Sequence, residues 1–336
     1  MKCVLAVDGG NTKTIALVAA LDGTILGYGR GGCGDIYNSG GDIKESLANI
    51  DYAVTTALRM AQAEPADLVS GVFNMAGADW PEDFAVLQAA MSERLYGREI
   101  LIQNDALGIL HAGTTGNVGV SVVCGTGAAT GARGPDGRVW HSSFWQIQAE
   151  GSVQLSRKAL ERVFLAELGL EIPTSLTARV LDTFAVSSIE ELLRQMTSRD
   201  FRGKRPRSES LTPVLLDEAE AGDELAYRLV RDHGYALGDI ANVAARKVGI
   251  EGTAFPLVLG GGVFRHPSSL LERAIVERVR TVSPEACPVR ARYEPVIGVL
   301  FSALELAGIA LDQELIARLE PTIPDHSLFD TVNGRL

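Results

Sequence analysis

One pattern of strands and turns occurs twice in this chain of 336 residues. Residues 2–29 alternate three apolar segments with a glycine-rich turn and an Asp-Gly turn, which predicts an antiparallel meander of strands. From residue 118 the order repeats, with Gly-Thr-Gly after the first strand and Pro-Asp-Gly before the third. Because a repeated unit indicates two related halves, we predict an α/β fold with two lobes facing each other across a cleft.

Strands and helices alternate in the rest of the chain. Apolar residues at spacings of three and four predict a helix over residues 39–63, and alternation with the strands near 68–74 and 99–103 predicts a parallel section of sheet. Residues 151–249 are expected to be mostly helical. We divide the chain into a first lobe, 1–114, a second lobe with helical insertions, 115–312, and a C-terminal tail, 313–336.

Charge and cysteine content exclude several classes of protein. The net charge of −11 argues against binding to nucleic acid or to an anionic membrane surface, since both require clustered Lys and Arg. No apolar stretch approaches the roughly 20 residues of a membrane span. The four cysteines lie far apart without ligand or disulfide spacing. We therefore expect a cytoplasmic protein that acts on small molecules.

The first glycine-rich turn has the chemistry to hold phosphate. Its sequence, residues 8–14, is Asp-Gly-Gly-Asn-Thr-Lys-Thr, in which the glycines allow close approach and the following amides and hydroxyls donate hydrogen bonds. Asp8, at the end of a strand, would hold Mg²⁺ through water. An ordinary hairpin turn explains the same residues equally well.

Three further segments have comparable ambiguity. Asp105 follows a strand and precedes a helix, where it is either a general base or a helix N-cap. Gly125-Thr126-Gly127 could meet phosphate from the opposite side. Gly260-Gly261-Gly262 ends an apolar strand and suits a nucleotide base or ribose, or a simple strand-to-helix turn. Neither a Walker A motif nor a G-x-G-x-x-G motif opening a helix is present.

In this order, the motifs resemble those of the actin, hexokinase and heat-shock ATPase superfamily, which has two RNase H-like lobes. More narrowly, over residues 2–308, the chain resembles the BadF/BadG/BcrA/BcrD ATPase family, which includes N-acetylglucosamine and glucosamine kinases. The resemblance is carried by residues 7–14, 103–106, 125–127, 218–226 and 258–264.

The resemblance implies an ATP-dependent sugar kinase with Mg²⁺ as cofactor, and it allows a homodimer. Asp105 would be the catalytic base and Asp8 the residue that holds Mg²⁺. The implied phosphate and ATP contacts are Asp8, Gly9, Gly10, Asn11, Thr12, Lys13, Gly125, Thr126, Gly127, Gly261 and Gly262. The implied sugar contacts are Asn38, Ala76, Gly77, Asn104 and Glu150.

One segment departs from the pattern of the N-acetylglucosamine kinases. Those proteins carry Gly-Trp-Gly followed shortly by Gly-Asp-Glu-Gly-Ser, whereas residues 142–152 here read Ser-Ser-Phe-Trp-Gln-Ile-Gln-Ala-Glu-Gly-Ser. Ala149 stands where an Asp would grip a sugar hydroxyl, which changes recognition of that hydroxyl. Trp145 could stack on a sugar ring.

Two other functions stay open at this stage. An ATPase that activates a partner dehydratase belongs to the same family, but such activators hold an iron–sulfur cluster with cysteines that this chain does not match. A sugar or nucleotide sensor that binds without turnover is the other alternative, motivated by the altered segment at residues 142–149.

Overall fold

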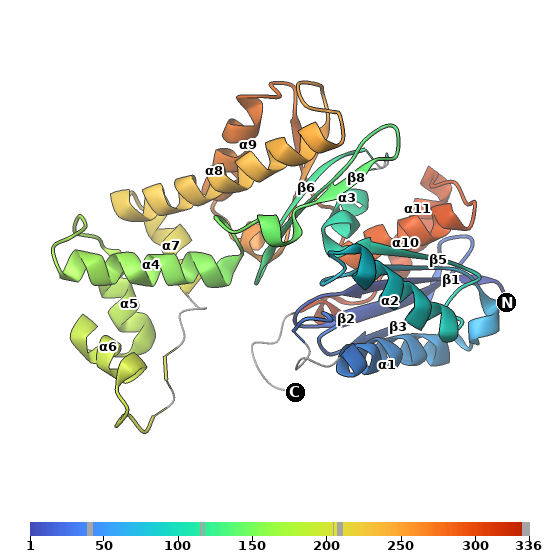
Figure 1. The fold of residues 1–336 in the computed structure, drawn as a ribbon, viewed down its shortest axis with the longest axis horizontal. Helices are drawn as coiled ribbons and strands as arrows, with labels where there is room; N and C mark the ends of the chain where they lie inside the picture. Colours follow the sequence, from blue (N-terminus) through green and yellow to red (C-terminus); the bar gives the residue numbers. More distant parts are fainter. Residues whose placement is uncertain (39–42, 115, 117, 204, 207–210, 331–336) are drawn as a thin grey trace.

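Two five-stranded sheets form the centres of two lobes (Figure 1). The computed structural model describes residues 1–38, 43–114, 116, 118–203, 205–206 and 211–330. The strand orders are β3-β2-β1-β4-β5 in the first sheet and β10-β9-β6-β7-β8 in the second. Read from the antiparallel edge, both sheets have the same arrangement, so the two-lobed α/β fold predicted from the repeat is confirmed.

The first sheet combines an antiparallel meander with a parallel section. β1 pairs antiparallel with β2, which pairs antiparallel with β3, while β1 and β4, and β4 and β5, run parallel. β1 is buried along almost its whole length because helices cover both faces of the sheet. The strands are β1 (Cys3–Gly9), β2 (Thr14–Ala20), β3 (Ile25–Gly31), β4 (Leu68–Met75) and β5 (Glu99–Asn104).

Several helices belong to the described part of this half of the sequence. α1 (Ile43–Ala61) packs against β3, and its apolar face shares a hydrophobic core with residues of β1. α2 (Pro81–Glu93) begins with proline in its first turn and packs against β5. A short 3-10 helix, η2 (Asp105–Leu107), leads directly into α3 (Gly108–Gly113).

The second sheet repeats this layout with shorter outer strands. β6 (Gly119–Cys124), β7 (Ala128–Arg133) and β8 (Val139–His141) form the antiparallel part, and β9 (Pro256–Gly260) runs parallel to β6. β10 (Cys287–Arg290) adds a further parallel strand that the sequence did not predict. It is short, half-exposed and contains Pro288, so no apolar pattern marks it.

A helical insertion separates β8 from β9. α8 is the longest helix, packs against α9 and covers the second sheet, whereas α4 to α7 extend away from it at the left of Figure 1. The predicted helical character of this part of the chain is confirmed. The helices of the insertion are α4 (Ser152–Glu167), α5 (Leu176–Phe184), α6 (Ile189–Thr197), α7 (Leu211–Glu220) and α8 (Glu224–Lys247), and α9 (Leu270–Arg280) follows β9.

The chain returns to the first lobe at its C-terminal end. α10 (Pro295–Leu306) packs against β1 and β4 of the first sheet and against α3, although the sequence division groups it with the second lobe. α11 (Gln313–Leu319) follows, and Leu315 joins the same core. The backbone N–H of Ile25 donates to Thr322 Oγ1 over 3.0 Å. The described part of the tail is therefore folded onto the first lobe.

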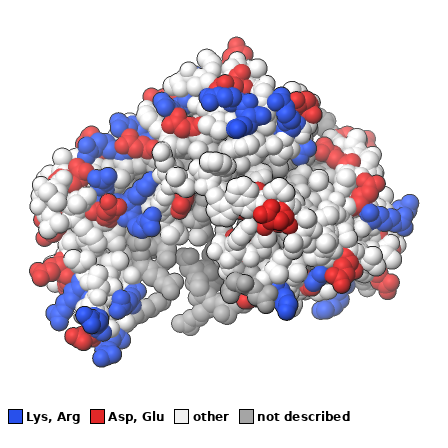
Figure 2. Space-filling model, in the orientation of Figure 1, with Lys and Arg blue, Asp and Glu red and all other residues white. Residues whose placement is uncertain are grey.

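The surface carries both signs of charge. Figure 2 shows Lys and Arg interspersed with Asp and Glu over both lobes on the face that it presents. Within the described ranges, no helix has the length and apolar character needed to cross a lipid bilayer.

Candidate active site

Hydrogen bonds within the first glycine-rich turn and from the end of β4 fix its base, and its tip remains exposed. Gly10 N donates to the Lys13 carbonyl over 2.9 Å, which closes the turn between β1 and β2. Ala76 N donates to the Gly9 carbonyl over 2.7 Å, so the end of β4 supports the turn. Asn11 and Thr12 are exposed at the tip. The turn therefore presents polar groups to solvent on a rigid base.

Two half-buried carboxylates lie beside this turn. Asp8 ends β1 and Asp105 directly follows β5, and since β1, β4 and β5 run parallel, these strand ends meet at one edge of the sheet. Burial raises the pKa of Asp8 to about 7, and repulsion from Asp105 adds to this effect. Burial also raises the pKa of Asp105 to about 7, with further repulsion from Asp79 and Asp35. At neutral pH both groups are poised to exchange protons.

Asp35 and Asp79 complete an acidic cluster, defined here as Asp8, Asp35, Asp79 and Asp105. The Asp35 carboxylate is buried and accepts from Tyr37 N, at 2.8 Å. Asp79 Oδ1 accepts from Asn104 Nδ2 over 3.0 Å, and burial raises the pKa of Asp79. The sequence analysis missed both acids. Asp35 lies three residues before Asn38 and Asp79 two after Gly77, so proximity to those residues was the available signal.

The residues implied to contact sugar on the first lobe come together around this cluster. Asn38 Nδ2 donates to Asp35 Oδ2 over 2.8 Å and to Asn11 Oδ1 over 2.6 Å, which connects it to the first turn. Gly77 has φ +80°, and a Cβ there would lie 2.6 Å from Asp35 Oδ1. Only glycine fits this close approach without strain. Ala76 and Asn104 flank the same space, at the ends of β4 and β5.

The second lobe presents two glycine turns beside each other. Gly125 N donates to the Gly127 carbonyl over 2.8 Å, which forms a tight turn with Thr126 and Gly127 exposed. Gly261 has φ +104°, and a Cβ on it would lie 2.6 Å from the Cys124 carbonyl oxygen. This contact places the strand end at Gly261 against the residue that precedes Gly125. The Gly-Thr-Gly turn and the Gly260–Gly262 turn thus form one surface.

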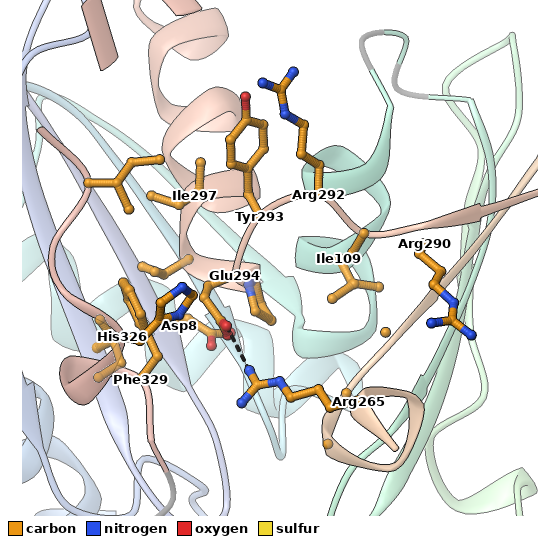
Figure 3. Close-up of a pocket in the computed structure, with 18 of the residues that line it drawn as sticks. Asp8, Ile109, Arg265, Arg290, Arg292, Tyr293, Glu294, Ile297, His326 and Phe329 are labelled. Carbon is orange, nitrogen blue, oxygen red and sulfur yellow. Dashed lines mark hydrogen bonds and ion pairs between the residues drawn. The ribbon is translucent and has the colours of Figure 1, made fainter. Parts of the chain in front are cut away.

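A cavity of about 570 Å³ lies between the lobes (Figure 3). It is lined by Asp8 and Lys13 of the first turn and by Gly261 and Gly262 of the second lobe. We call it the interlobe cavity. Volumes of this size accommodate small organic ligands. The geometry therefore brings together four residues that the sequence analysis assigned to ATP.

Charged residues that the sequence analysis missed also line the interlobe cavity. Arg265 Nη2 lies 2.6 Å from Glu294 Oε1, and Figure 3 shows this pair beside Asp8. Arg265 follows the Gly260–Gly262 turn, and Glu294 immediately precedes α10. No motif marks either residue, because their pairing depends on how the two segments approach in three dimensions.

Lys13 is directed toward the C-terminal segment. Its Nζ donates to the Phe329 carbonyl, and burial lowers the pKa of the ammonium group, with repulsion from Arg30 as a smaller cause. Phe329 also lines the interlobe cavity. The C-terminal segment therefore forms part of the wall beside the first turn.

Glu150 stands apart from the other residues implied to contact sugar. Its side chain is exposed, and it lines neither the interlobe cavity nor the acidic cluster. Its backbone carbonyl accepts from His233 Nε2 over 2.8 Å. Ala149 beside it is buried in the core of the second lobe. The position where the family resemblance implies an Asp is thus occupied here by a packed methyl group.

The donor set near Asp8 suits a magnesium ion that keeps much of its water. Across the part of the chain that the structure describes, no three His, Cys, Asp or Glu side chains gather in a metal-binding group. Mg²⁺ in phosphoryl-transfer sites typically uses one or two carboxylates, with water and phosphate oxygens completing the shell. The two half-buried carboxylates, Asp8 and Asp105, would also gain a compensating positive charge. The residues therefore fit the ion.

The four cysteines lie in different places. Cys3 is buried in β1 and Cys124 in β6, Cys33 is half-buried, and Cys287 is exposed in β10. In the described residues they form no metal-binding group.

The paired sheets, the glycine turns and the half-buried carboxylates at the strand ends indicate an ATPase with a two-lobed α/β fold. The chain belongs to the BadF/BadG/BcrA/BcrD ATPase family, whose sequence pattern matches residues 5–303. The family resemblance drawn from the motifs is confirmed, and with it the use of ATP.

Three similar proteins bear kinase names. An N-acetyl-D-glucosamine kinase of Dictyostelium discoideum is 26% identical over 89% of this chain and 97% of its own. An N-acetylmuramic acid/N-acetylglucosamine kinase of Clostridium acetobutylicum is 25% identical over 81% of this chain and 89% of its own. A solved structure from Chromobacterium violaceum, provisionally assigned as an N-acetylglucosamine kinase, has a TM-score of 0.62 at 21% identity and covers 90% and 98% of the two chains.

Proposed function

We propose that this protein is an ATP-dependent sugar kinase that phosphorylates a hydroxyl of a small amino sugar, N-acetylglucosamine or glucosamine. The observation that carries the proposal is the placement of Asp105, a half-buried carboxylate at the sheet edge beside Asp8 and the first turn. The names and the coverage of the related kinases support the same activity.

Asp105 acts as the general base in the proposed reaction. It accepts the proton of the sugar hydroxyl, whose oxygen forms a bond to the γ-phosphorus of ATP while the bond from phosphorus to the bridging oxygen breaks and ADP leaves. A pKa raised to about 7 by burial suits this role, since a base is most effective when its pKa lies near the working pH. Little other covalent chemistry is needed, so positioning and electrostatics dominate.

Polar groups of the first lobe orient the sugar. Sugar hydroxyls can bond to the amides of Asn38 and Asn104 and to the carboxylates of Asp35 and Asp79. Hydrogen bonds from Asn38 to Asp35 and from Asn104 to Asp79 hold these side chains in place. Ala76 and Gly77 allow the sugar to approach the backbone. Glu150 remains a candidate sugar contact that would have to reach the acceptor from the second lobe.

The glycine turns bind the nucleotide. Amides and hydroxyls of Gly9 to Lys13, and of Gly125 to Gly127, are directed at phosphate, and the Gly261-Gly262 backbone lies along the adenosine. Asp8 would hold Mg²⁺ through water, and the ion would neutralise negative charge on the phosphate oxygens. The interlobe cavity, which Asp8, Gly261 and Gly262 line together, supports this arrangement.

An ADP-release assay tests the function. Glucosamine, N-acetylglucosamine, N-acetylmuramic acid and glucose are each offered with ATP and Mg²⁺. We expect rapid ADP release with at least one amino sugar, and mass spectrometry of that product should show one added phosphoryl group. Sugar binding without ADP release would instead support a sensor. ADP release that no sugar stimulates, with an iron–sulfur absorption band after anaerobic purification, would support an activator ATPase.

A cytoplasmic location and a homodimer are the remaining parts of the proposal. Size-exclusion chromatography with light scattering tests the homodimer, and a mass corresponding to one 35.8 kDa chain would contradict it.

A further inference from the structure

Exposed aromatic side chains gather near Asp79 of the acidic cluster. Tyr37, Trp80, Phe144 and Trp145 are 47%, 44%, 57% and 72% exposed. We call these four residues the aromatic patch. Tyr37 and Trp80 belong to the first lobe, and Phe144 and Trp145 to the 3-10 helix η3 (Ser143–Trp145) of the second. Aromatic rings left in water at a cleft commonly mark a binding surface.

Ring contacts join the two halves of the patch. The Phe144 ring lies 5.7 Å from the Tyr37 ring at an interplanar angle of 86°. It also lies 6.3 Å from the Trp80 ring, at 15°. These are ordinary edge-on and stacked geometries. The Tyr37 hydroxyl donates to Asp83 Oδ1 over 2.9 Å, which fixes the first-lobe side of the patch.

A cavity of about 400 Å³ opens beside these rings. Trp80, Phe144 and Trp145 line it together with Asp79, His141 and Ser143. Asp79 belongs to both this cavity and the acidic cluster, and it accepts a hydrogen bond from Asn104, the neighbour of Asp105. The cavity therefore adjoins the acidic cluster at Asp79.

The segment that carries Phe144 and Trp145 is held in an unusual conformation. Ser143 has φ +42°, in the left-handed region that non-glycine residues rarely adopt. Its Oγ lies 2.5 Å from His141 Nδ1. Backbone strain of this kind persists only where surrounding contacts enforce it, and it concentrates at ligand sites. The same segment departs from the Gly-Trp-Gly pattern of the related kinases.

From these features, and resting on the proposed kinase function, we propose that the acceptor is a glycoside: an amino sugar with a second ring attached. The sugar that receives phosphate lies over Asp105, and the second ring, a sugar or an aryl group, stacks against Trp145 and Trp80 in the aromatic cavity. Aromatic side chains bind the flat apolar faces of such rings, and the polar edge at Asp79, His141 and Ser143 suits remaining hydroxyls.

Matched acceptors test this proposal. The assay compares kcat/KM for N-acetylglucosamine and glucosamine with kcat/KM for their aryl α- and β-glycosides and for N,N′-diacetylchitobiose. We expect at least one two-ring acceptor to exceed its parent sugar. In Trp145→Ala the ratio of kcat/KM for the two-ring acceptor to kcat/KM for its parent sugar should fall by about 2- to 10-fold, the effect of losing one aromatic contact. Trp145→Phe should retain most of the preference because it keeps a ring. Tyr52→Ala, an exposed aromatic on α1, is the control and should leave the ratio unchanged.

The outcomes separate this proposal from the kinase assignment. The proposal is wrong if the parent sugars are phosphorylated and every two-ring acceptor has a lower kcat/KM than its parent. It is also wrong if Trp145→Ala lowers kcat/KM equally for parent sugars and two-ring acceptors. Either result would leave the kinase assignment intact. If no sugar is phosphorylated, calorimetric titration with the aryl glycosides decides. Binding that Trp145→Ala weakens would retain the subsite while refuting the kinase, whereas absence of binding would overturn both.

Discussion

Arg265 and Glu294 form an ion pair of 2.6 Å that bridges the two halves of the interlobe cavity. Arg265 comes from the segment after β9 in the second sheet, and Glu294 precedes α10, which packs on the first sheet. The Arg265 side chain is 57% exposed, so the pair contributes little to stability. Because the pair lines the same cavity as Asp8 and Gly262, we predict that Arg265 contributes to nucleotide binding.

Replacing Arg265 by Ala should raise the KM for ATP about tenfold, the effect of losing roughly 1.4 kcal/mol of charge-assisted binding. The sugar KM should change little, because the acidic cluster is untouched. Steady-state kinetics at varied ATP measures both. Arg278→Ala removes an ion pair of the same length on α9 and serves as the control. An ATP KM equal to that of the control variant would contradict this role.

The Asp105→Asn variant should lose about 10²- to 10⁴-fold in kcat, because the amide cannot accept the hydroxyl proton. ATP binding, followed by calorimetry, should be retained, since the glycine turns remain. Asp239→Asn, on the surface of α8, controls for the chemical change. Turnover close to that of the wild type would rule out Asp105 as the base.

Gly261→Ala should destabilise the protein by about 1–3 kcal/mol, the usual cost of an enforced unfavourable backbone conformation. Its φ is +104°, and the new methyl group would meet the Cys124 carbonyl at 2.6 Å. Urea denaturation measures the loss. Gly262→Ala is the matched control, since a Cβ there meets nothing within 4 Å. Equal stabilities of the two variants would show that the close contact is not maintained in solution.

His233 should make the protein less stable in acid. Burial lowers the pKa of His233 to about 4, with a smaller contribution from Lys158. An unfolded histidine has a pKa near 6.5, so as the pH falls from about 6.5 to 4 the unfolded chain binds a proton that the folded chain excludes. The free energy of unfolding should decrease by about 3 kcal/mol over this window and should not depend on His233 above it.

The variant His233→Gln isolates this effect. Glutamine can still donate to the Glu150 carbonyl but does not titrate. The difference between the pH profiles of the wild type and the variant, from urea denaturation at each pH, should contain the decrease between pH 6.5 and 4. Parallel profiles would mean that His233 is solvated or protonated in the folded protein.

The repeated meander made the fold predictable. Apolar segments alternate with glycine turns over β1 to β3 and over β6 to β8. This local pattern predicts the strands, because consecutive strands joined by a short turn pair with each other. β10 escaped prediction because four half-exposed residues carry no pattern. The packing of helix α10 against the first sheet depends on a return of the chain that no local signal describes.

The same division applies to the candidate site. Asp8, Asp105 and the glycine turns follow strands, so their chemistry is visible in the order of residues. Asp35, Asp79, Arg265 and Glu294 become significant only through neighbours that are distant in sequence.

The sequence by itself determined the family, the repeated sheet and the residue types directed at phosphate, since these depend on short motifs and local periodicity. Only the tertiary structure decided that the acids cluster, that Arg265 reaches Glu294, and that Phe144 meets Tyr37 and Trp80. The physical reason is that electrostatic repulsion, ion pairing and ring contact act over a few ångströms between segments many residues apart. Their effect depends on the folded geometry and not on the order of residues.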